Sequence, residues 1–189
     1  MTITDTETHI TADEFRHAFR SHPAGVAVIT ADAGDGPVAM TVSSVASVSI
    51  DPPTLVFSAS SLSSSTPTIR KAGTVVVHML AADEVGLAKL CARRGADRFG
   101  PDAEWDRLPT GEPYYPAANW LRCKVTQCID ANGSSLIVVE AIQAKDSAGD
   151  DTREPTPLVY HNREWHVLSD KSALPATAVP FYAVYGRDE

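Results

Sequence analysis

The feature that most constrains the fold is a series of short segments rich in Val, Ser and Thr, separated by turns rich in Gly, Pro and Asp. β-Branched residues favour strands, and closely spaced turn residues keep each element short. Many short strands with few helices are typical of a β-barrel with helical additions, so we expect a mainly β fold. The expected strands are residues 26–31, 38–50, 54–58, 74–80, 120–129 and 136–142, followed by a hairpin of 158–160 and 165–168.

One of these segments is interrupted in the middle and stopped at its end. The apolar positions of residues 38–50 do not keep the period of two that a regular strand requires. We therefore expect a bend or a loop near Ser43 and Ser44. Asp51-Pro52-Pro53 then stops the segment, because proline has no N–H to donate to a neighbouring strand. Further along, Asp130-Ala131-Asn132-Gly133 predicts a tight hairpin turn.

Helices are indicated by their capping residues. Thr11-Ala12-Asp13-Glu14 is a capping box, which predicts the start of a first helix. Thr66 is expected as the N-cap of a short second helix, which Gly73 ends. Residues 83–94 predict a third helix. Residues 97–116 have scattered Gly and Pro and few periodic apolar positions, so we expect a long loop there.

Length and charge limit the possible functions. The chain has 189 residues, which fits one domain, with a core of about residues 11–168, a short polar N-terminal segment and a C-terminal arm. A net charge of −8 argues against a nucleic-acid surface, which needs clustered positive charge. The sequence has no apolar run of the roughly 18 residues that a membrane span needs, and no secretory signal. We expect a cytoplasmic protein.

The three cysteines and six histidines lack zinc-ligand spacing, so no metal site is expected.

Two clusters of small hydroxyl residues follow predicted strands. Residues 58–66 run into the start of the short second helix, where unpaired N–H groups and a partial positive charge favour an anion. Arg70 and Lys71 raise the potential one turn further on. Residues 41–49 form the other cluster. Taken alone, a helix cap with a serine loop and an edge strand with exposed hydroxyls explain these clusters more simply, so both interpretations stay open.

The order of these pieces carries a resemblance. Residues 25–30 and 41–49, with Asp51-Pro52-Pro53 and Leu55-Val56-Phe57, resemble the flavin reductase-like family. The resemblance runs from about Phe15 to Leu168. It includes Ser65-Thr66 with Ile69, the pair Arg98-Phe99, and Pro157-Leu158-Val159-Tyr160 with Arg163. It implies the FMN-binding split-barrel fold and a homodimer with the flavin near the subunit interface.

The resemblance also implies which residues contact the flavin, FMN or FAD. One loop would hold the ring and ribityl chain largely through backbone groups, and a second strand would add contacts. The start of the short helix would hold the phosphate, and a third segment would touch the edge of the flavin. In this order, the implied residues are Thr41, Val42, Ser43 and Ser44; Ser58, Ala59 and Ser60; Ser65 and Thr66; and Arg98 and Phe99.

One position departs from the family pattern. Many members carry Gly-Asp-His or Gly-Thr-His after the hairpin turn, and that histidine is associated with the nicotinamide site. Here the residues are Gly133-Ser134-Ser135, which puts Ser135 at the position of the histidine. His161 or Arg163 on the last hairpin are candidates to replace it.

Three functions are therefore compatible with the sequence. The first is an NAD(P)H-dependent flavin reductase that supplies reduced flavin to a partner monooxygenase. The second is a non-catalytic flavin-binding protein that lacks the nicotinamide-site histidine. The third is a split-barrel protein that uses flavin on a substrate of its own. Hydride transfer needs the two rings positioned more than it needs an acid or a base, so the missing histidine does not exclude the first.

Overall fold

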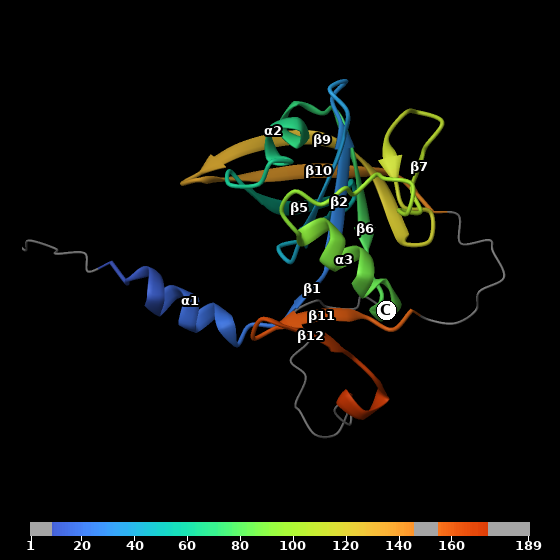
Figure 1. Ribbon diagram of the computed structural model, residues 1–189. Coiled ribbons are helices and arrows are strands. Elements are labelled where there is room, and N and C mark those ends of the chain that lie inside the picture. Colours follow the sequence, from blue (N-terminus) through green and yellow to red (C-terminus); the bar gives the residue numbers. More distant parts are fainter. Residues whose placement is uncertain (1–8, 146–154, 174–189) are drawn as a thin grey trace, which may run out of the picture.

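A curled antiparallel sheet of seven strands forms the body of the protein (Figure 1). The structure is a computed structural model that describes residues 9–145 and 155–173. The strand order across the sheet is β3-β2-β6-β9-β10-β5-β4. These strands are β2 Ala27–Asp32, β3 Pro37–Val42, β4 Ala46–Ile50, β5 Pro53–Ser60, β6 Thr74–Met79, β9 Asn119–Ala131 and β10 Ser134–Ala144.

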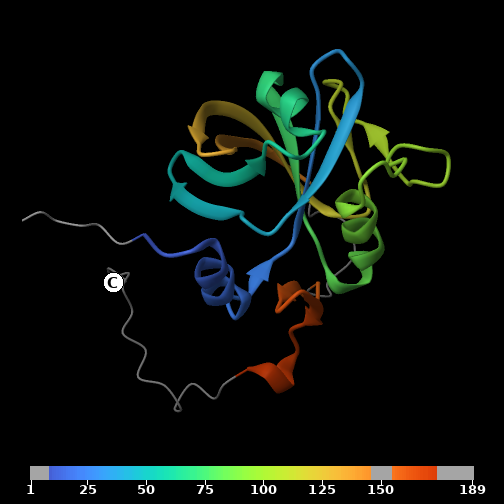
Figure 2. The same cartoon turned by 60° about the vertical axis from the view of Figure 1, so that its left-hand side comes forward.

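The two edge strands of this sheet are consecutive in the chain. β3 and β4 lie at opposite ends of the strand order, yet residues 43–45 alone connect them. The sheet must therefore curl until its edges approach, which Figure 2 shows as an open barrel. The predicted break near Ser43 and Ser44 is confirmed, because this short link lets the chain change direction between the two edges.

Smaller sheets lie beside the barrel. β1 (Ala24–Gly25), β11 (Leu158–His161) and β12 (Glu164–Val167) form a three-stranded sheet under the open end (Figure 1). The segment expected to be a long loop contains a further pair of two-residue strands, β7 (Asp106–Arg107) and β8 (Pro113–Tyr114). Such short strands have no periodicity that a sequence pattern can detect.

The three expected helices are present. They are α1 Ala12–Arg20, α2 Thr66–Lys71 and α3 Val85–Ala92, with short 3-10 turns η1 at Ala82–Glu84 and η2 at Asp170–Ser172. The capping box at the start of α1 is confirmed: the Glu14 N–H donates to Thr11 Oγ1, and the Glu14 carboxylate accepts from the Thr11 N–H. α1 has no buried residue and projects from the barrel (Figure 1).

The N-cap of α2 is Ser65, one residue before the predicted Thr66. The Thr66 hydroxyl donates to the Ser60 carbonyl oxygen at 2.6 Å, and the Ser65 hydroxyl donates to that of Ala39 at 2.8 Å. Both hydroxyls thus serve contacts to other segments, and neither caps the helix. This is why a rule based on local residue preference misplaces the cap by one position.

Alternation along the strands builds the core. In β5, for example, Leu55, Phe57 and Ala59 are buried while the residues between them are partly exposed. They pack with Ile29, Val75, Val77, Ile137 and Val139 inside the barrel. A second cluster lies between the barrel and α3 and contains Val28, Ala39, Ala88 and Tyr115.

His78 of β6 is fully buried between these layers. Its Nδ1 lies 3.0 Å from the carbonyl oxygen of Val28, and the N–H of Tyr115 donates to its Nε2 at 3.0 Å. A carbonyl can only accept and an amide can only donate, so the imidazole is neutral with its proton on Nδ1. Burial lowers the pKa of His78 to about 4.

This neutral histidine predicts an acid-sensitive fold. In the unfolded chain its pKa is about 6.5, so protons favour unfolding as the pH falls below that value. The free energy of unfolding should fall by about 2 kcal/mol from this group alone between about pH 7 and pH 5. Urea unfolding of the wild type and of His78→Gln at about pH 7 and about pH 5 measures this loss of stability. The variant should be less stable at pH 7 and lose less on acidification; an equal loss in both proteins would contradict the assignment.

Candidate functional site

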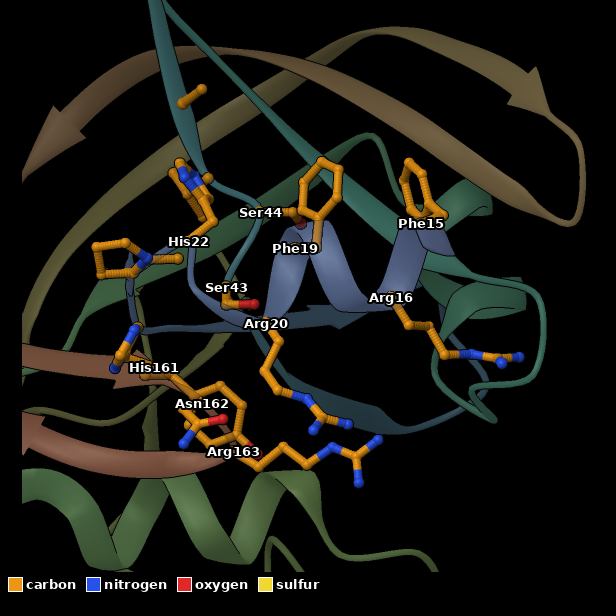
Figure 3. A pocket seen from close by; sticks show the side chains of 16 residues that line it. Phe15, Arg16, Phe19, Arg20, His22, Ser43, Ser44, His161, Asn162 and Arg163 are labelled. Atoms are coloured by element: carbon orange, nitrogen blue, oxygen red, sulfur yellow. The ribbon is translucent and has the colours of Figure 1, made fainter. Parts of the chain in front are cut away.

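A cavity lies between α1, the link from β3 to β4, and the turn from β11 to β12. Its volume is about 750 Å³ (Figure 3). Ser43 and Ser44 line one wall, α1 lines another, and His161, Asn162 and Arg163 line a third. Two of the predicted flavin residues, and both candidates for the role of the missing histidine, therefore meet at one cavity.

Contacts within the backbone fix this arrangement. The N–H of Asn162 donates to the carbonyl oxygen of Arg20 at 3.1 Å, which joins the end of α1 to the hairpin turn. Figure 3 shows the rings of Phe15 and Phe19 on one side of α1 and the side chains of Arg16 and Arg20 on the other. No local sequence signal indicates that α1 lies at this cavity, although the capping box located the helix itself.

The predicted loop and the predicted contact strand lie together. Ser44 Oγ accepts from the Ser58 N–H at 2.9 Å and donates to the Ser58 carbonyl oxygen at 3.2 Å. Thr41 Oγ1 donates to the carbonyl oxygen of Ala88 on α3 at 2.7 Å, and Val42 is buried in the barrel. Since these three side chains contact the protein, the segment offers a ligand the exposed Ser43 side chain and the backbone groups of the link.

Ser60, Ser65 and Thr66 form a separate group at the start of α2 and do not line the cavity. Ser65 and Thr66 are buried, and their hydroxyl hydrogens are donated to carbonyl oxygens. Ala59 is buried in the barrel core. A phosphate at this end would therefore need backbone N–H groups or the neighbouring exposed serines of residues 61–64.

Arg98 and Phe99 lie after α3 and also outside the cavity. Tyr115 Oη donates to the Arg98 carbonyl oxygen and Trp105 Nε1 to that of Phe99, both at 2.8 Å. The Phe99 ring stacks on Tyr115, with 6.0 Å between the ring centroids. Among the described residues, Arg98 Nε is a buried donor without a hydrogen-bond partner. This segment is thus held rigidly and keeps one donor uncommitted.

Ser135 lies inside the barrel rather than at the cavity. It is 2 % exposed, and Arg70 Nη1 donates to its hydroxyl at 2.5 Å. The same guanidinium pairs with Asp130. Pairing of β10 with β5 sets Ser135 opposite Ala59 on the core face, so Ser134 faces the other way. A histidine at position 135 would be buried against Arg70.

The described residues contain no group of His, Cys, Asp and Glu side chains that could hold a metal ion. Nor does any helix within 9–145 and 155–173 have the length and apolar character to cross a membrane.

Comparison with known proteins identifies the family. The sequence profile of the flavin reductase like domain matches residues 19–169. The chain belongs to the flavin reductase-like family. It is 37 % identical to the NADH:FMN oxidoreductase of Rhodococcus qingshengii. The alignment of 162 residues covers 84 % of this chain and 83 % of that protein.

Solved structures of flavin reductases share the fold. A flavin reductase domain protein from Arthrobacter sp. FB24 aligns with a TM-score of 0.76 and 32 % identity, over 84 % of this chain and 96 % of that one. BorF, the flavin reductase component of a bacterial two-component tryptophan halogenase, aligns with a TM-score of 0.72 and 30 % identity, over 85 % and 99 % of the two chains. The expected mainly β split-barrel fold is confirmed.

Proposed function

We propose that this protein is an NAD(P)H-dependent flavin reductase that takes FMN or FAD and releases reduced flavin. This proposal rests on the match to the family, which spans most of the chain. One of the chain's relatives is an NADH:FMN oxidoreductase. FMN and NADH are accordingly the first pair to test. The domain boundaries remain a proposal too: one domain with a core of about residues 11–168.

The described residues suit a flavin. The backbone link at Ser43 and Ser44 provides amide groups at the cavity wall, and the unpartnered Arg98 Nε suits a carbonyl or ring-nitrogen acceptor. When bound, the flavin supplies the chemistry: a hydride from nicotinamide C4 reduces its N5, and one proton completes the reduced flavin. The protein's part is to hold both rings in contact and to limit water between them.

The non-catalytic alternative has less support. The relatives described above are named as reductases rather than as flavin carriers. No specific observation favours the third reading, in which the flavin acts on a substrate of this protein.

Partners and location complete the proposal. BorF is the reductase component of a two-component halogenase, and another relative is the reductase component of a flavin-dependent trigonelline monooxygenase. We propose a flavin-dependent monooxygenase as the partner here. A homodimer is proposed because large apolar side chains remain exposed on β4, β9 and β10. The cytoplasm is proposed as the location, since that is where reduced nicotinamide nucleotides are available.

The decisive experiment measures NADH and NADPH oxidation by the purified protein with FMN or FAD added. We expect sustained turnover that depends on added flavin, with the nucleotide preference read from kcat/KM. The visible spectrum of the purified protein then shows whether flavin stays bound as a cofactor or binds and leaves as a substrate. Mass spectrometry identifies any flavin that is released. A protein that binds flavin but oxidises neither nucleotide would favour the non-catalytic alternative.

A further inference from the structure

α1 carries an apolar face that the described part of the chain leaves exposed. Phe15 and Phe19 lie one turn apart on the same side of the helix, with 4.6 Å between their ring centroids. Figure 3 shows the side chains of Arg16 and Arg20 on the other side. The two phenylalanines are 51 % and 57 % exposed, and Ile10, just before the helix, is 66 % exposed. We call Ile10, Phe15 and Phe19 the apolar face of α1.

A helix as short as α1 needs a covering on this face. It has nine residues, none of them buried, and an isolated helix shorter than about 12 residues is only marginally stable in water. The capping box satisfies donors at its start, and the hydrogen bond from the Asn162 N–H to the Arg20 carbonyl oxygen holds its end. Neither contact takes apolar surface out of water, although such burial supplies most of the stability of helices in proteins.

An apolar segment near the end of the same chain is available to cover this face. Residues 178–185 read AVPFYAVY, eight positions without a polar side chain apart from the tyrosine hydroxyls. The strands of the barrel contain no more than four such residues in succession. An uninterrupted apolar run of this length is typical of a buried segment. It follows Ala173, the last residue that the structure describes, and lies outside the family match, which ends at residue 169.

The described chain ends close enough to α1 for this segment to reach it. β12 lies two strands from β1, about 10 Å across the small sheet, and β1 follows α1 in the chain. η2 and Ala173 come directly after β12 (Figure 1). The chain from Ala173 to Phe181 can span up to about 27 Å. Because both segments belong to one chain, their effective concentration is on the order of millimolar, which favours even a small contact.

We propose that residues 178–185 pack on the apolar face of α1 of the same chain. Phe181, Tyr182 and Tyr185 supply large aromatic surfaces, and Phe15 and Phe19 receive them. The exposed apolar side chains of β4, β9 and β10 belong to the proposed contact between two copies, so α1 is the apolar surface left to this segment. Because α1 forms one wall of the cavity, the segment also holds that wall in place.

Amide hydrogen exchange of the full chain, followed by mass spectrometry on peptides from residues 12–20 and 178–185, tests this. In the wild type both segments should exchange about tenfold or more slowly than an unstructured peptide. Phe181→Asp should remove most of the protection of α1, because a carboxylate opposes burial of the apolar run. Phe19→Asp should in turn remove the protection of residues 178–185. Thr177→Asp is the matched control, since it adds the same charge just outside the run and should change neither segment.

The barrel strands should exchange alike in all four proteins, which separates loss of docking from loss of the fold. Equal protection of α1 in the wild type and in Phe181→Asp would overturn the proposal, and so would an α1 that is unprotected in the wild type. Docking within one chain does not depend on protein concentration. Protection of α1 that falls when the wild type is diluted would therefore assign the covering to a second copy and contradict the proposal.

Discussion

Replacing Glu112 with Ala should lower the free energy of unfolding by about 3–5 kcal/mol. Glu112 is 5 % exposed, and its Oε1 accepts from Arg122 Nε at 2.8 Å and from Thr74 Oγ1 at 2.6 Å. Thr110 donates to Oε2. Truncation leaves the half-buried Arg122 guanidinium without its counter-charge, which costs more than the pair contributes to stability. Urea unfolding at neutral pH, with equal m-values for both proteins, gives the difference.

Two further variants separate charge from packing. Burial raises the pKa of Glu112, but hydrogen bonds from Thr110, Thr74, its own backbone and Arg122 outweigh this and hold the pKa below its ordinary value. The carboxylate is therefore charged at neutral pH, and Glu112→Gln should be less stable than the wild type but more stable than Glu112→Ala. Asp13→Ala breaks an exposed ion pair and should have little effect. A loss below about 1 kcal/mol in Glu112→Ala would show that Arg122 finds water or another partner.

Replacing Leu136 with Asp should convert the proposed dimer into a monomer. Leu136 on β10 lies directly opposite Ile129 on β9, and the two side chains are 38 % and 46 % exposed. Val48 and Ile50 on the edge strand β4 are exposed as well. A two-fold axis would bury one new carboxylate in each subunit, which should weaken association by about 3 kcal/mol or more, a factor of a hundred.

Light scattering at micromolar concentration measures this. The wild type should give twice the chain mass of 20.2 kDa, and Leu136→Asp should give the chain mass itself. Leu62→Asp is the matched control, because Leu62 is 92 % exposed in the loop before α2 and lies off the sheet face. A wild type that is monomeric, or a Leu136→Asp variant that stays dimeric, would contradict the proposed interface.

Local sequence patterns determined most of the elements. β-Branched runs between turn residues located the strands of the barrel, and the Thr11–Glu14 capping box located α1. Asn132-Gly133 predicted the turn between β9 and β10, where both residues have positive φ. These features depend on backbone torsion preferences and on hydrogen bonds within a few residues, which a single segment encodes by itself. The family resemblance added the fold and the chemistry.

Only the tertiary structure decided which side chains share a site. Pairing register turned Ser135 into the barrel, and a shift of one residue would have turned it out. The hydroxyls of Thr66 and Ser65 donate to the distant carbonyl oxygens of Ser60 and Ala39, and the helix begins with Ser65 as its N-cap instead of the predicted Thr66. The cavity joins α1 to a hairpin about 140 residues further along the chain, through a hydrogen bond between Asn162 and Arg20. Long-range packing makes that contact, and neither segment carries a local signal for the other.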